Sequence, residues 1–481
     1  MPEDAPGKTG FGASKASAEF WQGRPNAAKC EKHIGFLRRR EKTALIIGRR
    51  RATLCSESKL TAAEAAVCTF GTIMEKRRAV VTGIGVVSPL GNSASLFYEG
   101  LKANRSGIRA MTEWNREFGK NIAGAPVTLD PAEVKAISRK VRRTMGNAAL
   151  FSGLAARQAV TQSGIDAAEF GSGRVGCVIG STVGSASSMT EACVAEFEGR
   201  RDDLSACHFF RLMSHSSSFN VADMLGITGF QLSTNSACAS GLQAIGTALE
   251  LIQLGKADAV LAGGSDESTP LVASSFQLLY ALAEEESAEP DKLSRPFDAD
   301  RKGLVCSEGA GILVVEELEH ARRRGAPILF EIAGYATNCS GWHVSHSDAR
   351  QIANCMKSAL DDAGINASEV DYVSAHATGT KVGDQAEAEA IREVLGGEVP
   401  VSSLKGHIGH TLGASGALEL AAVAGMMREN IVLPTRNLTK VDDCAGILLP
   451  RTIEERKLRV CLKNSIAFGG VNATLICRRF D

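Results

Sequence analysis

The sequence predicts an α/β protein, in which buried strands alternate with helices along the chain. From residue 79 onward, short runs rich in Val, Ile and Ala recur without the alternation of apolar and polar residues that marks a half-exposed strand. Such runs are typical of sheets that helices cover on both faces. Helical segments fall between these runs. In residues 239–254, apolar side chains recur on one helical face, and Gly255 follows.

Five segments have the pattern of a buried strand, and the first of them ends in a Gly and Pro turn. The predicted strands lie at residues 79–89, 174–180, 257–264, 311–316 and 370–376. A charged turn at residues 320–327 divides the folded chain into two predicted domains, 74–322 and 323–481. No sequence repeat with a period of 20–50 residues is visible, so any similarity between the two halves has to be structural.

The composition excludes several classes of protein. The 481 residues carry 54 Lys and Arg and 54 Asp and Glu, so no overall charge attracts nucleic acid. No apolar run reaches the roughly 18–20 residues that a membrane-spanning helix needs. The 13 cysteines are scattered without a repeated Cys-x-x-Cys pair. This argues against a disulfide framework or a zinc site and favours the reducing cytoplasm.

The first 73 residues differ from the rest in charge and pattern. They carry 13 Lys and Arg against 7 Asp and Glu, with Arg clusters at 38–40 and 49–51, and they show no sustained helix or strand period. We interpret residues 1–73 as a disordered extension or as a mis-assigned start, with Met74 as the first residue of the protein. An organelle transit peptide is the alternative, and the seven acidic residues argue against it.

Cys238 is the candidate nucleophile. It lies among small residues at the start of the helix predicted at 239–254. A cysteine in this position meets free backbone N–H groups and the positive end of the helix dipole, which favour the thiolate. Its small neighbours leave room for a substrate to reach the sulfur. The alternative is a buried, inert cysteine.

Two histidines strengthen this assignment. His376 lies where a predicted strand ends in a Gly and Thr loop, a frequent place for functional groups in open α/β sheets. His410 precedes a Gly- and Ala-rich helix that we expect to be buried, and burial favours a neutral imidazole. A satisfied core imidazole is the alternative for each, and we interpret His407 as a packing or loop residue. No metal is expected, because no carboxylate or cysteine lies at suitable spacing from His407 and His410.

Near the C-terminus, Phe468 precedes two glycines. The flexible backbone of such a segment can approach a ligand closely. A plain Gly turn between two strands is the alternative.

Six motifs occur in a fixed order: Val-Val-Thr-Gly-Ile-Gly at 80–85, Ser-Ala-Cys-Ala-Ser-Gly at 236–241, Ser-Arg-Pro-Phe-Asp at 294–298, Ala-His-Ala-Thr-Gly-Thr at 375–380, Gly-His-Thr-Leu-Gly-Ala at 409–414 and Phe-Gly-Gly at 468–470. In these motifs the sequence resembles the elongating β-ketoacyl-acyl carrier protein synthases of the type I/II condensing enzymes. The resemblance extends from about Arg78 to Phe480.

The resemblance implies the thiolase fold, with two similar α/β halves in five layers (αβαβα), working as a homodimer. It implies a decarboxylative Claisen condensation of an acyl-cysteine with malonyl-acyl carrier protein, in fatty-acid or related polyketide or lipid chain elongation. No metal or organic cofactor is implied, because the thioester already activates both carbons.

Carried over residue by residue, the family's nucleophile falls on Cys238 and its two catalytic histidines fall on His376 and His410. Its buried lysine falls on Lys405, and the acidic residue associated with that lysine falls on Glu387. Residues 384–387 also have the pattern of a helix capping box, which is the structural alternative for Glu387.

The family's gating phenylalanine falls on Phe468, whose backbone N–H is expected to bind the oxyanion together with that of Cys238. Thr378 and Thr380 are expected to hydrogen-bond the malonyl carboxylate.

Residues 138–143 contain four cations, Arg139, Lys140, Arg142 and Arg143. The resemblance implies that basic residues of this region dock the acidic acyl carrier protein. A solvated helix face is the alternative.

Departures from the family pattern leave the pathway open between housekeeping fatty-acid synthesis and a polyketide or aryl-polyene route. They are Ala467, Val471, His407, Ser307 and the polar stretch 209–220. The main alternative function is a non-catalytic partner subunit, such as a chain-length factor. A subunit of that kind would lack the nucleophile, whereas Cys238 is present.

Overall fold

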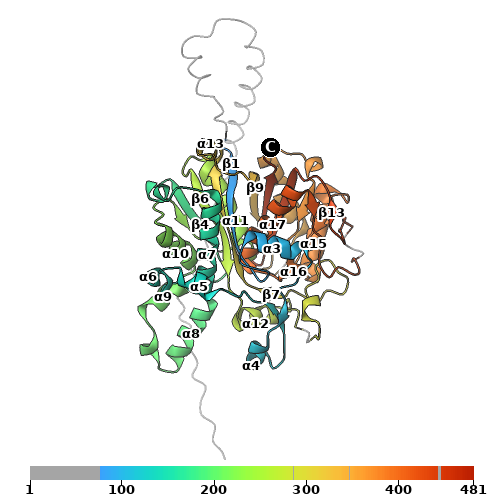
Figure 1. Cartoon of the computed structure of the whole chain (residues 1–481). Helices are drawn as coiled ribbons and strands as arrows, with labels where there is room; N and C mark the ends of the chain where they lie inside the picture. The colour runs from blue at the N-terminus through green and yellow to red at the C-terminus, as the bar shows by residue number, and fades with distance from the viewer. Residues whose placement is uncertain (1–75, 285–286, 346, 443–445) are drawn as a thin grey trace, which may run out of the picture. The chain divides into compact units, whose positions relative to one another are not determined.

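The computed structural model describes residues 76–284, 287–345, 347–442 and 446–481 (Figure 1). Residues Lys76–Asp481 form one compact unit. The predictions for residues 1–73 lie outside the described residues, and the domain boundary after residue 322 stays a prediction. In the part of the chain that is described, no helix is long and apolar enough to cross a membrane.

Ten strands form one sheet, in the order β11-β10-β14-β15-β9-β1-β8-β6-β4-β5. They are β1 (Ala79–Val87), β4 (Val175–Gly180), β5 (Gln231–Leu232), β6 (Ala259–Asp266), β8 (Gly309–Glu317), β9 (Phe330–Cys339), β10 (Tyr372–Ser374), β11 (Val401–Ser402), β14 (Val460–Ala467) and β15 (Val471–Arg478). The five predicted strands are confirmed as β1, β4, β6, β8 and β10. All five are buried on both faces, which is why their sequences do not alternate.

The sheet consists of two halves with the same strand order. The first half contains β1, β4, β5, β6 and β8, which we number first to fifth along the chain. Across the sheet these strands lie in the order first, fifth, fourth, second, third, and β9, β10, β11, β14 and β15 of the second half repeat that order. In each half the second strand is parallel to the third and fourth, and the fifth is antiparallel to the first and fourth. The halves join where residues 79–81 pair antiparallel with 330–332.

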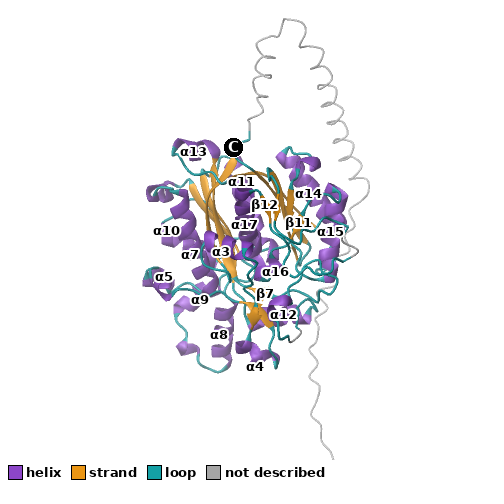
Figure 2. Ribbon diagram, turned by 45° about the vertical axis from the view of Figure 1, so that its right-hand side comes forward, coloured by secondary structure: helices purple, strands orange, loops and turns teal. Residues whose placement is uncertain are grey.

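Helices cover both outer faces of the two half-sheets and fill the space between them (Figure 1, Figure 2). The outer layers are α7 (Asn147–Ser163) with α10 (Ser216–Leu225), and α14 (Ala349–Ala363) with α15 (Lys381–Leu395). The middle layer contains α3 (Ala94–Lys102), α11 (Ser240–Gln253) and α17 (Ser415–Glu429). The largest buried clusters lie between these layers. The five-layer arrangement of two similar α/β halves is therefore confirmed.

Further helices and short strands include α4 (Asn115–Phe118), α5 (Pro131–Lys135), α6 (Arg139–Arg142), α8 (Ala186–Phe197), α9 (Ala206–Leu212), α12 (Pro270–Leu278), α13 (Leu318–Arg323), α16 (Lys405–Ile408), β2 (Arg109–Ala110), β3 (Ala123–Ala125), β7 (Cys306–Ser307), β12 (Ile431–Val432) and β13 (Glu454–Glu455). The charged segment predicted as a turn at 320–327 is helical in its first part. There, the Glu317 side chain accepts the backbone N–H of His320 and caps α13.

The two central helices carry the site. Each follows a short 3₁₀ turn: η5 (Ala237–Ala239) precedes α11, and η8 (Leu412–Ala414) precedes α17. Helix α17 is buried on nearly all sides, so small residues are needed where its neighbours approach. At Gly416, an added Cβ atom would lie 2.8 Å from Cβ of Leu242 on α11. The prediction of a buried, closely packed helix after His410 is confirmed.

Candidate active site

Cys238 lies in the turn η5, directly before α11, and its side chain is buried. The preceding residue, Ala237, has φ of 46°, in the left-handed region that residues other than Gly rarely adopt. This strained turn sets the thiol at the N-terminal end of the central helix, where the sequence predicted it. Backbone strain of this kind often accompanies a functional site.

His410 is the hydrogen-bonding partner of the thiol. Its Nε2 atom lies 2.9 Å from Cys238 Sγ, and its Nδ1 atom lies 3.0 Å from Ser415 Oγ. The Ser415 hydroxyl in turn lies 3.0 Å from Thr411 Oγ1. Because α17 holds Ser415 at its first residue, the helix fixes the orientation of the imidazole. One ring nitrogen faces the sulfur and the other faces a hydroxyl group.

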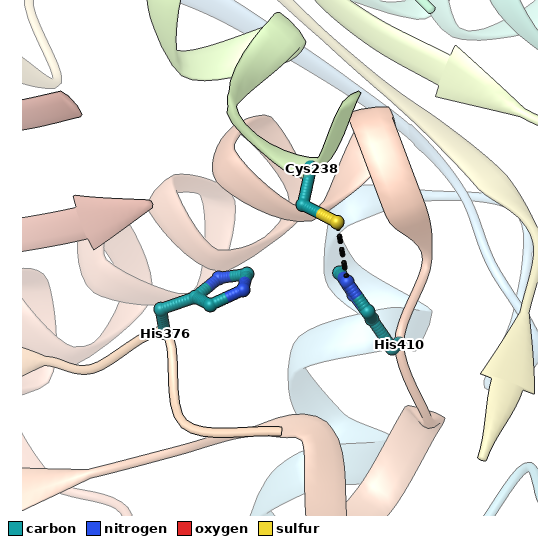
Figure 3. Close-up of side chains that lie close together, drawn as sticks. All are labelled: Cys238, His376 and His410. Atoms are coloured by element: carbon teal, nitrogen blue, oxygen red, sulfur yellow. Dashed lines mark hydrogen bonds between the residues drawn. The ribbon is translucent and has the colours of Figure 1, made fainter. Parts of the chain in front are cut away.

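His376 completes the cluster (Figure 3). Its ring centroid lies 5.2 Å from that of His410, with an angle of 81° between the ring planes. One ligating atom each from Cys238, His376 and His410 lies within 4.8 Å of the others. The Nδ1 atom of His376 is buried and has no hydrogen-bond partner among the described residues. The structure thus brings together the three groups that the sequence predicted.

Burial controls the charge states in this cluster. It raises the pKa of the Cys238 thiol to about 12, and the nearby Lys405 ammonium only partly opposes this. Burial, with Lys405 next, holds the pKa values of His376 and His410 well below the ordinary value, so both imidazoles are neutral. Loss of solvent thus opposes the thiolate that the helix N-terminus favours, and the charge state expected for Cys238 stays a prediction.

The three donor atoms could also hold a metal ion, since sulfur and imidazole nitrogen suit zinc. However, Cys238 Sγ and His410 Nε2 are already at hydrogen-bonding distance, which suits transfer of the thiol proton. The arrangement therefore has what an activated nucleophile needs: a thiol, a neutral base in contact with it, and a group that orients the base.

Glu387 anchors the loop that carries His376. Its carboxylate, fully buried on α15, accepts the backbone N–H groups of His376 at 2.8 Å and Ala377 at 2.7 Å. The capping-box alternative is wrong, because the N-cap of α15 is Thr380.

A second carboxylate of α15, Asp384, accepts the backbone N–H groups of Thr378 and Gly379. Burial raises the pKa of Asp384 to about 6. The hydroxyls of Thr378 and Thr380 lie 3.1 Å apart, and both residues line the cavity beside Cys238. The predicted substrate-binding threonines therefore face the reacting groups.

Lys405 is fully buried, as predicted, but its acidic partner differs from the predicted one. Its Nζ atom lies 2.5 Å from Glu419 Oε1, and Glu419 Oε2 lies 2.7 Å from Nζ of a second buried lysine, Lys463. The association of Glu387 with Lys405 is therefore corrected: Glu387 binds backbone amides, and Glu419 on α17 pairs with the lysine. Sequence reasoning missed both Glu419 and Lys463.

Phe468 borders a cavity of about 60 Å³ that contains Cys238 and both histidines. Its ring centroid lies 6.1 Å from that of Phe276 on α12. Gly469 and Gly470 follow with φ of 88° and 78°, values that favour glycine. The position of Phe468 at the cavity and the freedom of the glycines fit the predicted gate.

The four predicted docking cations lie away from the cavity and are not equivalent. Arg139 and Lys140 of α6 are exposed. The Arg142 guanidinium donates to the backbone oxygen of Val134, and that of Arg143 donates to the Cys207 sulfur at 3.0 Å. His407 is buried with both ring nitrogens unpartnered in the described residues and takes no part in the cluster.

Comparison with known proteins identifies the family of the chain. The family model described as "Beta-ketoacyl synthase, N-terminal domain" matches residues 76–321, and "Beta-ketoacyl synthase, C-terminal domain" matches 329–439. A relative from Haemophilus influenzae, 3-oxoacyl-[acyl-carrier-protein] synthase 1, is 37% identical over 410 residues, covering 84% of this chain and 100% of the relative.

Two solved structures are also similar. A β-ketoacyl synthase from Burkholderia phymatum superposes with a TM-score of 0.79 at 37% identity, covering 84% of this chain and all of that one. A type II polyketide synthase ketosynthase, solved with its acyl-carrier protein, superposes with a TM-score of 0.77 at 30% identity, covering 85% of this chain and all of that one.

Proposed function

Because the chain belongs to the β-ketoacyl synthase family, we propose that Cys238 is the nucleophile of its condensation reaction and that His376 and His410 assist it. The enzyme is an acyltransferase that condenses an acyl group with a malonyl unit on acyl carrier protein, in fatty-acid or polyketide chain elongation. The observation that carries the residue assignment is the 2.9 Å contact between Cys238 Sγ and His410 Nε2.

In the first step, the Cys238 sulfur attacks the carbonyl of an acyl thioester on the carrier. Because His410 Nε2 contacts the sulfur, the thiol proton passes to that nitrogen as the new carbon–sulfur bond forms. The carbon–sulfur bond to the carrier breaks, and the departing sulfur takes up the proton. Backbone N–H groups of Cys238 and Phe468 bind the oxyanion.

In the second step, malonyl-carrier protein loses CO₂, and an enolate forms next to the acylated cysteine. A neutral imidazole can donate one N–H group to the developing enolate oxygen, and burial keeps His376 and His410 neutral. For this step His410 carries its proton on Nε2, and its Nδ1 atom accepts a hydrogen bond from the Ser415 hydroxyl. Thr378 and Thr380 orient the malonyl carboxylate at the cavity wall. The enolate carbon then attacks the acyl carbonyl, and the Cys238–acyl bond breaks. Cys238 leaves as a thiolate and takes up a proton from solvent, which restores the free enzyme. Neither step calls for a metal or organic cofactor.

Lys405 does not touch the reacting atoms in this scheme. Its ammonium is paired with Glu419, and it lowers the pKa values of both histidines. We propose that Lys405 maintains the local arrangement of charges and transfers no proton.

Arg139, Lys140 and Arg143 are the docking cations that the structure leaves exposed. An acidic carrier would approach the basic face of α6 by charge attraction, which mainly sets the encounter rate. Arg142 and Arg143 are tied to protein groups and contribute less. A ketosynthase of similar fold has been solved with its acyl-carrier protein, which supports this partner.

The partner in the assembly is a second copy of the chain. Strand β5 forms one edge of the ten-stranded sheet, and both of its residues are exposed. Phe197, Phe209 and Phe210 expose large apolar surface on α8 and α9. An unpaired edge and exposed aromatic side chains are the features of an interface. Light scattering coupled to size-exclusion chromatography tests this, and a stable monomer at micromolar concentration would contradict it.

We propose a cytoplasmic location, and the free thiols of the nine described cysteines support it. The alternative of a non-catalytic chain-length factor is disfavoured, because the nucleophile and both histidines meet in one cavity.

Acylation of the purified protein tests the nucleophile. An acyl-carrier substrate should label Cys238, and mass mapping should find no label in Cys238→Ser. The matched control is Cys193→Ser, which removes an exposed thiol on α8 and should keep the label on Cys238. A native protein without acyl-Cys238 would overturn the assignment.

A further inference from the structure

A second lysine, Lys463, lies buried behind the two histidines. It is part of β14 and is 1% exposed. We propose that the Lys463 ammonium is a positioning residue for catalysis, which holds the segments of His376 and His410 in register. This inference rests on the roles proposed above for the two histidines.

Oxygen atoms surround the Lys463 ammonium. Its Nζ atom lies 2.7 Å from Glu419 Oε2 and 3.4 Å from the backbone oxygen of Ser374, and it also donates to the backbone oxygen of Asn464. Carboxylate and carbonyl oxygens satisfy a buried ammonium in this way. Burial lowers the pKa of this ammonium, and the Glu419 carboxylate opposes that shift.

The contacts of Lys463 link the two histidine segments. Ser374 ends β10 and stands two residues before His376. Glu419 shares its carboxylate between Lys463 and Lys405, and Lys405 stands five residues before His410. One carboxylate on α17 thus joins the ammonium of Lys405, in the His410 segment, to that of Lys463, which contacts the His376 segment through the Ser374 backbone oxygen. Replacement of either lysine is therefore expected to disturb the contacts that hold both imidazoles in place.

The charges around the imidazoles explain why a second ammonium matters. Burial is the largest cause that lowers the pKa values of the two histidines, and Lys405 and Lys463 both add to it. The charged and titratable groups that face the pair are Lys405, Lys463, Glu419, Glu387, Asp384, Asp266 and Cys238. Without Lys463, Glu419 and Glu387 would lose part of their counter-charge. The imidazoles would then be protonated at higher pH.

Two substitutions separate charge from packing. Lys463→Met fills the same space without charge, and Lys463→Ala leaves an oxygen-lined space that methylammonium can enter. In both variants we expect kcat for malonyl decarboxylation to fall about 100-fold, because displacement of a catalytic group by about 1 Å costs that much. The acidic limb of the pH–rate profile should move to higher pH. Methylammonium should restore Lys463→Ala and leave Lys463→Met unchanged. Lys357→Ala, which removes an exposed lysine, is the control.

The outcomes separate this inference from the proposed function. His376→Ala with native decarboxylation would overturn the proposed function itself. If His376→Ala is inactive but Lys463→Met decarboxylates malonyl-carrier protein at the native rate with an unchanged pH profile, only the role of Lys463 is overturned. The role of Lys463 is also overturned if Lys463→Ala folds but methylammonium does not restore its decarboxylation rate. If Lys463→Ala does not fold, the pH profile of Lys463→Met decides.

Discussion

Replacing Glu387 by alanine tests how the His376 loop is held. The fully buried carboxylate accepts the backbone N–H groups of His376 and Ala377 and, at 3.2 Å, the side-chain amide of Asn464. A buried donor that loses its acceptor costs about 1–3 kcal/mol. Because Glu387→Ala leaves two buried backbone N–H groups without an acceptor, we expect its free energy of unfolding to fall by about 2–6 kcal/mol. Glu387→Gln should lie in between, because the amide keeps one acceptor oxygen.

The same change should separate the two steps of the reaction. Once the loop loses its anchor, His376 moves away from the cluster, and we expect malonyl decarboxylation to slow by about 100-fold. Acylation of Cys238 should stay near the native rate, because His410 is held by Ser415 on another helix.

Urea denaturation measures the free energy of unfolding, release of labelled CO₂ measures decarboxylation, and mass spectrometry measures acylation. Glu393→Ala is the matched control, since Glu393 is an exposed residue of the same helix, paired with Lys357. The control should change the stability by no more than about 0.5 kcal/mol. Native stability and native decarboxylation in Glu387→Ala would refute the anchoring role, and an equal loss of both steps would refute the separation of roles.

Three further predictions follow from single contacts. Burial lowers the pKa of His407 to about 3, below the unfolded value, so its contribution to stability is lost as pH falls from about 6.5 toward 3, at about 1.4 kcal/mol per pH unit. His407→Met should therefore lose stability less steeply in urea titrations over that range, and identical slopes would contradict this. Reversal of Arg139 and Lys140 to Glu should lower kcat/KM for carrier-bound substrates about tenfold at low salt and spare small thioesters; equal effects on both substrates would exclude docking. Ser415→Ala removes the partner of His410 Nδ1 and should slow acylation about fivefold, since one neutral hydrogen bond contributes about 1 kcal/mol; an unchanged burst rate would show that Ser415 does not orient the ring.

Local sequence patterns are sufficient to predict the buried strands and to single out the three reacting residues. The unbroken apolar runs predict sheets covered on both faces, because only a strand buried on both sides has no need of polar residues. Cys238, His376 and His410 each stand at the end of a strand or the start of a helix, among small residues. Their meeting in one cavity follows from the resemblance, since residues 172 positions apart cannot be placed together by spacing alone.

The charge network behind the site was not predicted, although its members leave a trace in the sequence. Glu419 is the one acidic residue in the interior of the apolar helix α17, and Lys463 stands within a buried strand. Such residues are almost never buried without a partner. Their partners come from distant segments, however, so the pairing of Glu419 with two lysines requires the tertiary structure. The charge state of Cys238 also depends on its burial, which cannot be read from its neighbours in the sequence.

The turns before α11 and α17 show how two similar halves produce one site. Residues 239–241 and 414–416 both read Ala-Ser-Gly, and the residue before each turn's centre, Ala237 or Leu412, has positive φ. The position equivalent to Cys238 is Gly413, whose backbone N–H donates to Asp266 at 2.7 Å. An added Cβ at Gly413 would lie 2.7 Å from Asp266 Oδ2, so that turn has no room for a side chain. The first half can therefore present a nucleophile from its turn, whereas the second supplies a histidine three residues earlier. The shared motif is only three residues long, which is why a fold repeated strand for strand leaves no period in the sequence.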